Sequence, residues 1–359
     1  MCGSRACLLV IVIVMLLSAG CAQLRELVRS PSPGVTSEWA ELLGEIRGYE
    51  RAIGFANTNN FANLTREQEA FPFCGRASRL VLPYSYEDPA IEWSDVGSEQ
   101  ACRALAREAD IYYGESEALG EVATPLTPAM IEGKLDRFIY LVIHEDCHDQ
   151  FNLPYGIEEA LCDLLTFKAM AAFIAGKYGE YSLEAWAVRR YVETETARVY
   201  ATITYYDQLA ALYARYERKE ISSEVLLRER AVIYKNASAV LNRSKGELNN
   251  VRIANHMTYS RHYPFLEGVY AALGRDLARA VVFFKRVDKL KPSAAAVMKL
   301  NRIKSRESLE FLRAYEVAVL ETIRKALAEA VRDKISGTGF FDVYNFSPAF
   351  EDESERRSV

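Results

Sequence analysis

Beyond its first seventeen residues, this chain of 359 residues lacks any apolar run long enough to span a lipid bilayer. It also lacks an excess of basic residues, because 44 Lys and Arg stand against 49 Asp and Glu, and the net charge is −5. A nucleic-acid-binding surface needs clustered positive charge, so this balance argues against nucleic acid as the main partner. No short-period repeat is visible. The length allows one large or two smaller domains with a full hydrophobic core, as in an ordinary globular enzyme.

The start of the chain predicts export. Residues 8–17 form a short, wholly apolar run that follows Arg5 and is too short to cross a bilayer comfortably. Such a run is typical of the central region of a secretory signal peptide. It leads into the sequence Leu-Ser-Ala-Gly-Cys, which ends at Cys21 and resembles the bacterial lipobox. We therefore expect a lipoprotein signal peptide over residues 1–20.

The lipobox implies that Cys21 is lipidated and becomes the new N-terminus. A protein anchored in this way lies on the membrane instead of spanning it. Residues 21–36, which include two prolines, are then expected to form a tether between the lipid and the folded body. Ala22 after the cysteine favours the outer membrane of the bacterial cell envelope. The alternative is a plain secretory peptide that is cut near Ala22.

A histidine pair at helical spacing marks a candidate metal site. His144 and His148 belong to the sequence His-Glu-Asp-Cys-His, and residues four apart lie on one face of a helix. Glu145 lies beside them, where a carboxylate can take a proton from a metal-bound water. This is the arrangement of zinc hydrolases with an H-E-x-x-H motif. Apolar residues within 130–150 have helical spacing, and Thr127 is the candidate N-cap.

A second helical run, which begins near Ile157, offers the third ligand. We expect Glu159 rather than Glu158, because only Glu159 has an acid, Asp163, four residues on and on its own face. This Glu-to-Asp spacing resembles the gluzincin metallopeptidases, in which the Asp supports a ligand. Asp163 could then accept a hydrogen bond from the far nitrogen of His144 and fix its tautomer. Glu158 is expected to lie in solvent at the start of the helix, near the positive end of the dipole.

Four cysteines follow the lipobox, and an even number in an oxidising envelope permits disulfides. Cys74 with Cys102 is a reasonable pair in the N-terminal region. Cys147 and Cys162 each lie on one of the two metal helices. They could form a bond that clamps these helices, or they could be two small buried thiols, and both interpretations stay open. Thiolate ligation of zinc is a weaker third interpretation.

The remaining pattern predicts a mainly α chain of the α+β class. The strand candidates are residues 79–84 and 91–93, whereas most of the chain from about 100 to 330 is expected to be helical. The predicted helices outside the metal site are 39–49, 183–214, 226–241 and 309–332. The expected organisation is an N-terminal α+β portion (37–125), metal-binding helices (126–180), a helical C-terminal region (181–335) and a partly disordered tail (336–359).

Several segments together resemble the bacterial family of predicted aminopeptidase lipoproteins, which belongs to the gluzincins. The segments that carry this resemblance, besides the lipobox and the metal motif, are Glu45-Ile46-Arg47-Gly48-Tyr49, Ile53-Gly54-Phe55, Leu212-Tyr213-Ala214, 228–234, Asn249-Asn250, Thr258-Tyr259, Pro264-Phe265 and Gly274-Arg275-Asp276. The resemblance implies a gluzincin-like fold around two metal helices, a bound Zn²⁺ and a peptide or protein substrate. The chain departs from the family inside the motif, where Asp146 and Cys147 replace small or apolar residues. It also lacks a G-x-M-E-N type motif for a free N-terminus.

The resemblance also implies roles for individual residues. Glu145 would be the general base, and gluzincins often stabilise the oxyanion with a distant Tyr or His, for which Tyr259 is the candidate and His256 and His262 are the runners-up. The expected function is zinc-dependent peptide hydrolysis by an aminopeptidase. Two alternatives remain: an envelope scaffold that has lost hydrolysis, and a metallohydrolase that acts on cell-wall peptides.

Overall fold

Helices make up most of the molecule, as the apolar spacing predicts. The computed structural model describes residues 37–337 apart from 64–70, 97, 106–108, 117–122, 132–133 and 242–246. The predicted signal peptide, the lipidated Cys21, the tether and the tail beyond residue 337 lie outside the described residues. In the described part of the chain, no helix combines the length and the apolar character that a membrane span requires.

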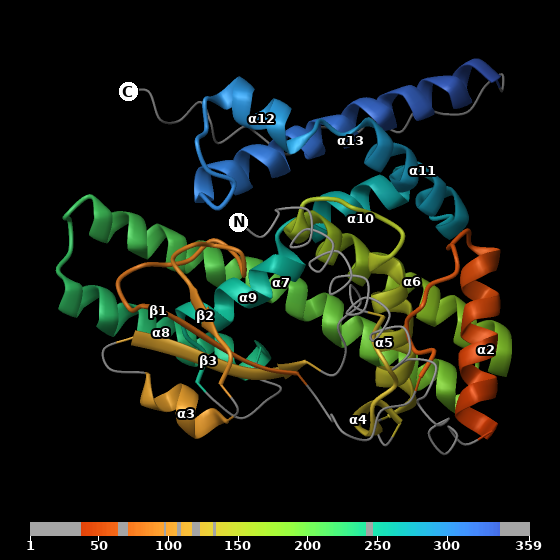
Figure 1. The fold of residues 1–359 in the computed structure, drawn as a ribbon, viewed down its shortest axis with the longest axis horizontal. Coiled ribbons are helices and arrows are strands. Elements are labelled where there is room, and N and C mark those ends of the chain that lie inside the picture. Colours follow the sequence, from red (N-terminus) through yellow and green to blue (C-terminus); the bar gives the residue numbers. More distant parts are fainter. Residues whose placement is uncertain are drawn as a thin grey trace, which may run out of the picture.

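The elements follow one another along the chain with a small sheet near the start (Figure 1). They are α2 (Ser37–Ala52), β1 (Phe71–Ser78), β2 (Glu92–Ser94), α3 (Glu99–Ala104), β3 (Ala109–Ser116), α4 (Pro128–Ile131), α5 (Leu135–His148), α6 (Tyr155–Tyr178), α7 (Leu183–Glu217), α8 (Ser223–Leu241), α9 (Asn250–Ser260), α10 (Tyr263–Ala272), α11 (Leu277–Leu290), α12 (Ala294–Asn301) and α13 (Leu309–Gly337). The predicted long helices are confirmed as α2, α7, α8 and α13.

One apolar core joins α2, the metal helices α5 and α6, and the C-terminal helices α10, α11 and α13. Helix α6 lies at its centre, because it buries side chains around its whole circumference over its first three turns. Trp39 of α2 packs on Phe138 of α5 with ring centroids 4.5 Å apart. Parts of the predicted N-terminal portion, metal helices and C-terminal region therefore meet in this core, whereas the second half of α7 packs with α8 and α9 in a separate apolar cluster.

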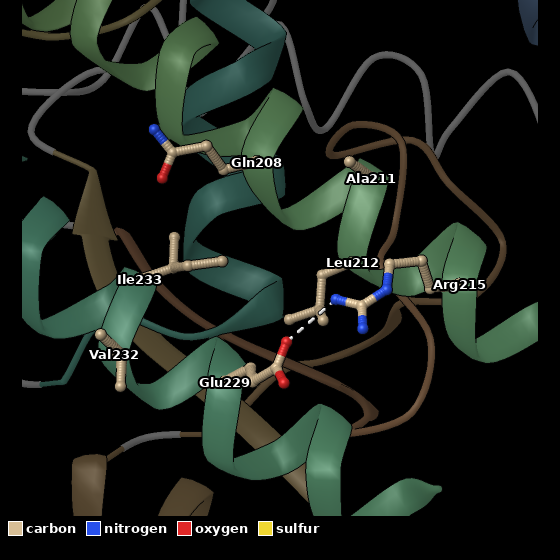
Figure 2. Close-up of a pocket in the computed structure, with 7 residues that line it drawn as sticks. All are labelled: Gln208, Ala211, Leu212, Arg215, Glu229, Val232 and Ile233. Atoms are coloured by element: carbon tan, nitrogen blue, oxygen red, sulfur yellow. Dashed lines mark hydrogen bonds and ion pairs between the residues drawn. The ribbon is translucent and has the colours of Figure 1, made fainter. Parts of the chain in front are cut away.

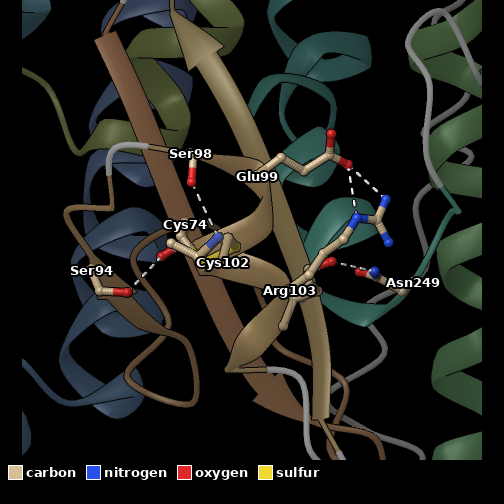
Figure 3. The surroundings of a disulfide bond; sticks show 9 residues. Cys74, Ser94, Ser98, Glu99, Cys102, Arg103 and Asn249 are labelled. Atoms are coloured by element: carbon tan, nitrogen blue, oxygen red, sulfur yellow. Dashed lines mark hydrogen bonds and ion pairs between the residues drawn. A yellow bond between two sulfur atoms is a disulfide. The ribbon is translucent and has the colours of Figure 1, made fainter.

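The three strands form an antiparallel sheet in the order β2-β1-β3. Helix α9 packs against β1 and β3. Gly75 of β1 has to be glycine, because a Cβ there would lie 2.5 Å from the Trp93 ring. A disulfide joins Cys74 of β1 to Cys102 of α3 (Figure 3), which confirms the predicted pair.

The strand predictions were partly wrong. Residues 91–93 overlap β2, but residues 79–84 are not a strand. Their carbonyl groups accept hydrogen bonds from helix side chains instead of a neighbouring strand: Asn250 Nδ2 donates to Val81 O at 2.6 Å, and Tyr206 Oη donates to Pro83 O at 2.9 Å. Strands β1 and β3 were not predicted, and β3 lies in the stretch that was expected to be helical.

Candidate metal centre

Three predicted ligands converge where α5 ends and α6 begins. The Nε2 atoms of His144 and His148 are 3.2 Å apart, and Glu159 Oε2 lies 3.2 Å from the first and 3.3 Å from the second. A tetrahedral zinc ion with ligands at about 2.0–2.1 Å separates them by about 3.3–3.4 Å, so these distances fit such an ion. The side chains of His144 and Glu159 are buried, and that of His148 is nearly so. This group can hold a metal ion.

A carboxylate lies behind each histidine. His144 Nδ1 is 3.3 Å from Asp163 Oδ1, as the spacing of Glu159 and Asp163 predicts, and Asp163 also accepts a hydrogen bond of 2.7 Å from the Tyr140 hydroxyl. His148 Nδ1 is 3.1 Å from Glu158 Oε1. Acceptors at the far nitrogens favour imidazoles whose Nε2 is free to bind a metal.

The expectation that Glu158 lies in solvent is wrong. Its residue is only 7% exposed, and Oε2 accepts the backbone N–H of Leu153 at 2.7 Å. The turn between α5 and α6 folds back over the start of α6, so that Glu158 faces His148 and the turn. Glu158 and Glu159 thus hold opposite sides of one imidazole.

The histidines and carboxylates of the group strongly affect one another's pKa values. Burial lowers the pKa of His144, but hydrogen bonds to Asp163 and Glu159 outweigh it and raise this pKa to about 10. Burial opposes the charge of Glu159, and the two histidines nevertheless lower the pKa of Glu159. A metal ion must displace protons from both imidazoles, so metal binding releases protons and weakens at acidic pH.

The unusual residues inside the motif face away from the ligands. Asp146 accepts hydrogen bonds from Thr58 Oγ1 at 2.5 Å and Asn60 Nδ2 at 3.1 Å, which joins α5 to the turn after α2. Cys147 and Cys162 are free, buried thiols, which is the second of the two interpretations left open, and no bond clamps the helices. Contact with Cys147, after burial, raises the pKa of the Cys162 thiol. Neither thiol belongs to the ligand group.

The ligand group opens into a cavity of about 820 Å³. Glu145, the predicted base, lines it together with both histidines and Glu159. The other walls come from β3, α7, α9 and the segment that carries Tyr86. A second cleft of about 360 Å³ lies between α7 and α8 (Figure 2). Among the described residues that line it, the charged ones are Arg215 and Glu229, which pair with each other.

The three candidates for oxyanion stabilisation lie in different places relative to the cavity. Tyr259 lines the cavity with its ring centroid 6.3 Å from that of His144, and burial raises the pKa of its hydroxyl. His256 also lines the cavity, and burial followed by the charge of Arg252 lowers its pKa to about 4. His262 is not among the residues that line it, and its Nε2 lies 3.1 Å from Glu316 instead.

Sequence reasoning missed Tyr155. It lies at the start of α6 and lines the cavity together with Glu159, which follows one turn later in the same helix. Burial, followed by the charges of Tyr259 and Glu159, raises the pKa of this hydroxyl. The four-residue spacing between Tyr155 and Glu159, which puts both on one helix face, is the pattern that could have revealed it.

Searches with this chain find no matching protein-family model, no matching curated protein and no matching solved structure. The mainly helical architecture with a small sheet is observed, whereas the gluzincin-specific arrangement stays a prediction. Function therefore has to be argued from the geometry of the site.

Proposed function

We propose that this protein is a zinc-dependent peptidase of the aminopeptidase type, held by a lipid anchor in the bacterial envelope. The observation that carries the proposal is the convergence of His144, His148 and Glu159 at the wall of an open cavity, with Glu145 beside them. Two imidazoles and one carboxylate are the ligand set of catalytic zinc sites that keep a position for water. The lipid anchor rests on the sequence around Cys21 alone.

A zinc ion at this site would act as a Lewis acid that lowers the pKa of water and polarises a carbonyl group. Glu145 would accept a proton from the attacking water. The hydroxyl adds to the scissile carbonyl carbon, the C–N bond breaks, and Glu145 delivers the proton to the leaving amine nitrogen. Asp163 and Glu158 would hold the two imidazoles in the orientation that metal binding needs.

Metal analysis of the mature protein tests the proposal first. We expect about one zinc per chain, lost in His144→Ala/His148→Ala and kept in Glu145→Gln. A peptide-library screen should then show cleavage by the wild type and none by Glu145→Gln. Absence of metal after zinc is supplied at neutral pH would favour the scaffold alternative. Bound zinc with equal activity of wild type and Glu145→Gln would remove the proposed base.

Tyr259→Phe tests the oxyanion role. Loss of one donor to the developing negative charge typically lowers kcat by about 10²–10³-fold, and zinc content should not change. Tyr200→Phe is the matched control, because the Tyr200 hydroxyl binds Glu267 and does not line the cavity. Unchanged turnover in Tyr259→Phe would move the role to Tyr155, the other tyrosine next to Glu159.

A further inference from the structure

Large apolar side chains are exposed where α6 turns into α7. Tyr181 is 93% exposed, Leu183 82% and Trp186 58%, and Tyr178 at the end of α6 is exposed as well. These four residues, which we call the apolar turn, lie within nine positions of the chain. Single exposed apolar residues are ordinary on a protein surface, whereas a group of them marks an interaction site.

The backbone of the apolar turn is held by local hydrogen bonds. Ser182 caps α7, because its Oγ accepts the Ala185 N–H at 3.1 Å and donates to the Gly179 carbonyl at 2.9 Å. Gly179 has φ of 90°, a conformation that favours glycine. Ala185 and Val188 are the buried residues at this end of α7. The core therefore takes these two side chains, and the larger apolar ones stay outside it.

The apolar turn lies at the end of the molecule where α2 begins. The Tyr49 ring centroid of α2 is 5.7 Å from that of Phe173 in α6, and Glu45 pairs with Lys177. Four residues towards the start of α2 thus correspond to four residues towards the end of α6, so the two helices run antiparallel, side by side (Figure 1). Ser37, the first residue of α2, lies further still in this direction.

This position brings the apolar turn close to the expected lipid. Residues 21–36 join Cys21 to α2 and, as a flexible chain, would span about 20–25 Å. A lipid at Cys21 would then hold this end of the molecule near the bilayer. Trp and Tyr side chains favour the interface between lipid and water. Residues 177–190 carry three basic and two acidic side chains, so their net charge is small and the attraction would be mainly apolar.

We propose that the apolar turn inserts into the headgroup region of the bilayer that carries the Cys21 lipid. This inference goes beyond peptide hydrolysis and rests on the lipid anchor in the proposed function. It also sets the height of the site, because Glu159 and Tyr178 lie in the same helix and nineteen residues at 1.5 Å each separate them by about 28 Å. The metal ligands would then lie well above the lipid, where a substrate dissolved in water reaches them.

The test attaches the protein to vesicles chemically, so that it does not depend on natural lipidation. The chain from Cys21 onwards is coupled through the Cys21 thiol to a maleimide phospholipid in vesicles of phosphatidylethanolamine and phosphatidylglycerol. Cys74 and Cys102 are bonded, and Cys147 and Cys162 are buried, so the coupling should occur at Cys21. Phospholipids brominated on their acyl chains near the headgroup then quench the fluorescence of any tryptophan that enters the bilayer.

We expect quenching in the wild type, and Trp186→Phe should remove most of it although Trp39 and Trp93 remain. Tyr181→Ser/Leu183→Ser should lower the inserted fraction about tenfold, because two apolar side chains no longer leave water on insertion. The matched control is Val232→Ser/Leu300→Ser, which removes side chains that are 58% and 82% exposed on α8 and α12. It should keep the wild-type quenching, and high salt should change it little.

Absence of quenching in the wild type, or equal quenching in Trp186→Phe, would overturn the inference. Dimers that Trp186→Ser dissociates, found together with absence of quenching, would assign the apolar turn to a second copy of this chain. The mass of the natural protein tests acylation of Cys21 separately, and zinc content tests the metal site. Quenching of the coupled chain with no acyl group on the natural one would reject the lipid anchor and keep the apolar turn as a membrane surface.

Discussion

The two sides of the candidate site are held together in different ways. On one side, α5 and α6 pack through apolar side chains, and their polar site residues come from two short stretches of sequence. On the other side, the segment before Tyr86 is held by buried polar contacts between residues far apart in the chain. Arg230 of α8 binds Asp110 of β3 through two contacts of 2.7 and 3.1 Å, and the Asn250 N–H donates to Asp110 at 3.0 Å.

The side held by polar contacts is also more sensitive to substitution. Asn250 Nδ2 donates to Val81 O at 2.6 Å, and the Tyr213 hydroxyl donates to Arg79 O at 2.8 Å. Arg230 of α8 also donates to Arg79 O, at 3.1 Å, so the backbone that leads to Tyr86 and Glu87 depends on side chains from α7, α8 and α9. An apolar interface tolerates small changes of shape, whereas a buried polar network becomes unfavourable when one partner is lost. We therefore expect substitutions in the polar network to have the largest effects on stability, and substitutions at α5 and α6 to affect metal binding.

Arg230→Met should have the largest effect on stability. It leaves the buried Asp110 carboxylate without its main partner, which typically costs about 3–5 kcal/mol of unfolding free energy. Arg215→Met is the matched control, because the ion pair of Arg215 with Glu229 is half exposed and typically contributes less than about 1 kcal/mol. Urea unfolding of both variants measures the difference, and equal losses would show that the network does not hold this side.

The two cysteine pairs also differ between the two sides, because Cys74 and Cys102 are bonded near the sheet and Cys147 and Cys162 are free on the metal helices. Reduction should lower the Tm of the wild type, because loss of the Cys74–Cys102 bond typically costs about 2–4 kcal/mol. The Cys74→Ser/Cys102→Ser variant should already be less stable and insensitive to reductant. Cys147→Ala should keep the full shift, because Cys147 and Cys162 are free thiols. A reductant effect that survives in Cys74→Ser/Cys102→Ser would place the sensitive bond elsewhere.

Asp163→Asn should act on the metal instead of the fold. Loss of the carboxylate behind a ligating histidine typically weakens metal affinity by about 10–100-fold, and Glu158→Gln should do the same through His148. Competition with a chelator of known zinc affinity gives the two constants. If only Asp163→Asn weakened zinc binding, the role of Glu158 would be to stabilise the turn at Leu153 and not to support the metal ligand His148.

Glu50→Gln should have an effect on stability that depends on pH. Burial, followed by the charge of Asp146, raises the pKa of Glu50 from 4.5 to about 10. The folded protein therefore keeps Glu50 neutral while the unfolded chain ionises it above about pH 4.5, so wild-type stability falls as pH rises from that value to about 10. Glutamine stays neutral in both states, so its stability relative to wild type should rise by about 1.4 kcal/mol for each pH unit between the two pKa values.

At about pH 3.5 the Tm values of wild type and Glu50→Gln should nearly coincide, because both folded and unfolded wild type are then largely protonated at Glu50. Glu41→Gln, at an exposed position of the same helix, is the control and should show no such dependence. A difference between Glu50→Gln and wild type that is constant from pH 5 to pH 8 would contradict the buried neutral carboxyl.

Sequence alone determined what local spacing controls. Residues four apart on a helix share a face, so spacing by itself predicted that His144 with His148, and Glu159 with Asp163, lie on two facing helices. Apolar periodicity likewise predicted the long helices, because a helix packs only when its apolar face meets the core. The Cys74–Cys102 pair could also be predicted, since few cysteines lie in the N-terminal region.

Only the tertiary structure decided the contacts between distant segments. Spacing does not show that Glu158 turns inward to His148, because that depends on how the turn at Leu153 closes. It cannot show that residues 79–84 give up strand pairing for side chains more than a hundred residues away. The place of Tyr86 and Glu87 in the cavity wall follows from those same long-range contacts, because chain segments far apart in sequence meet only once the whole core has formed.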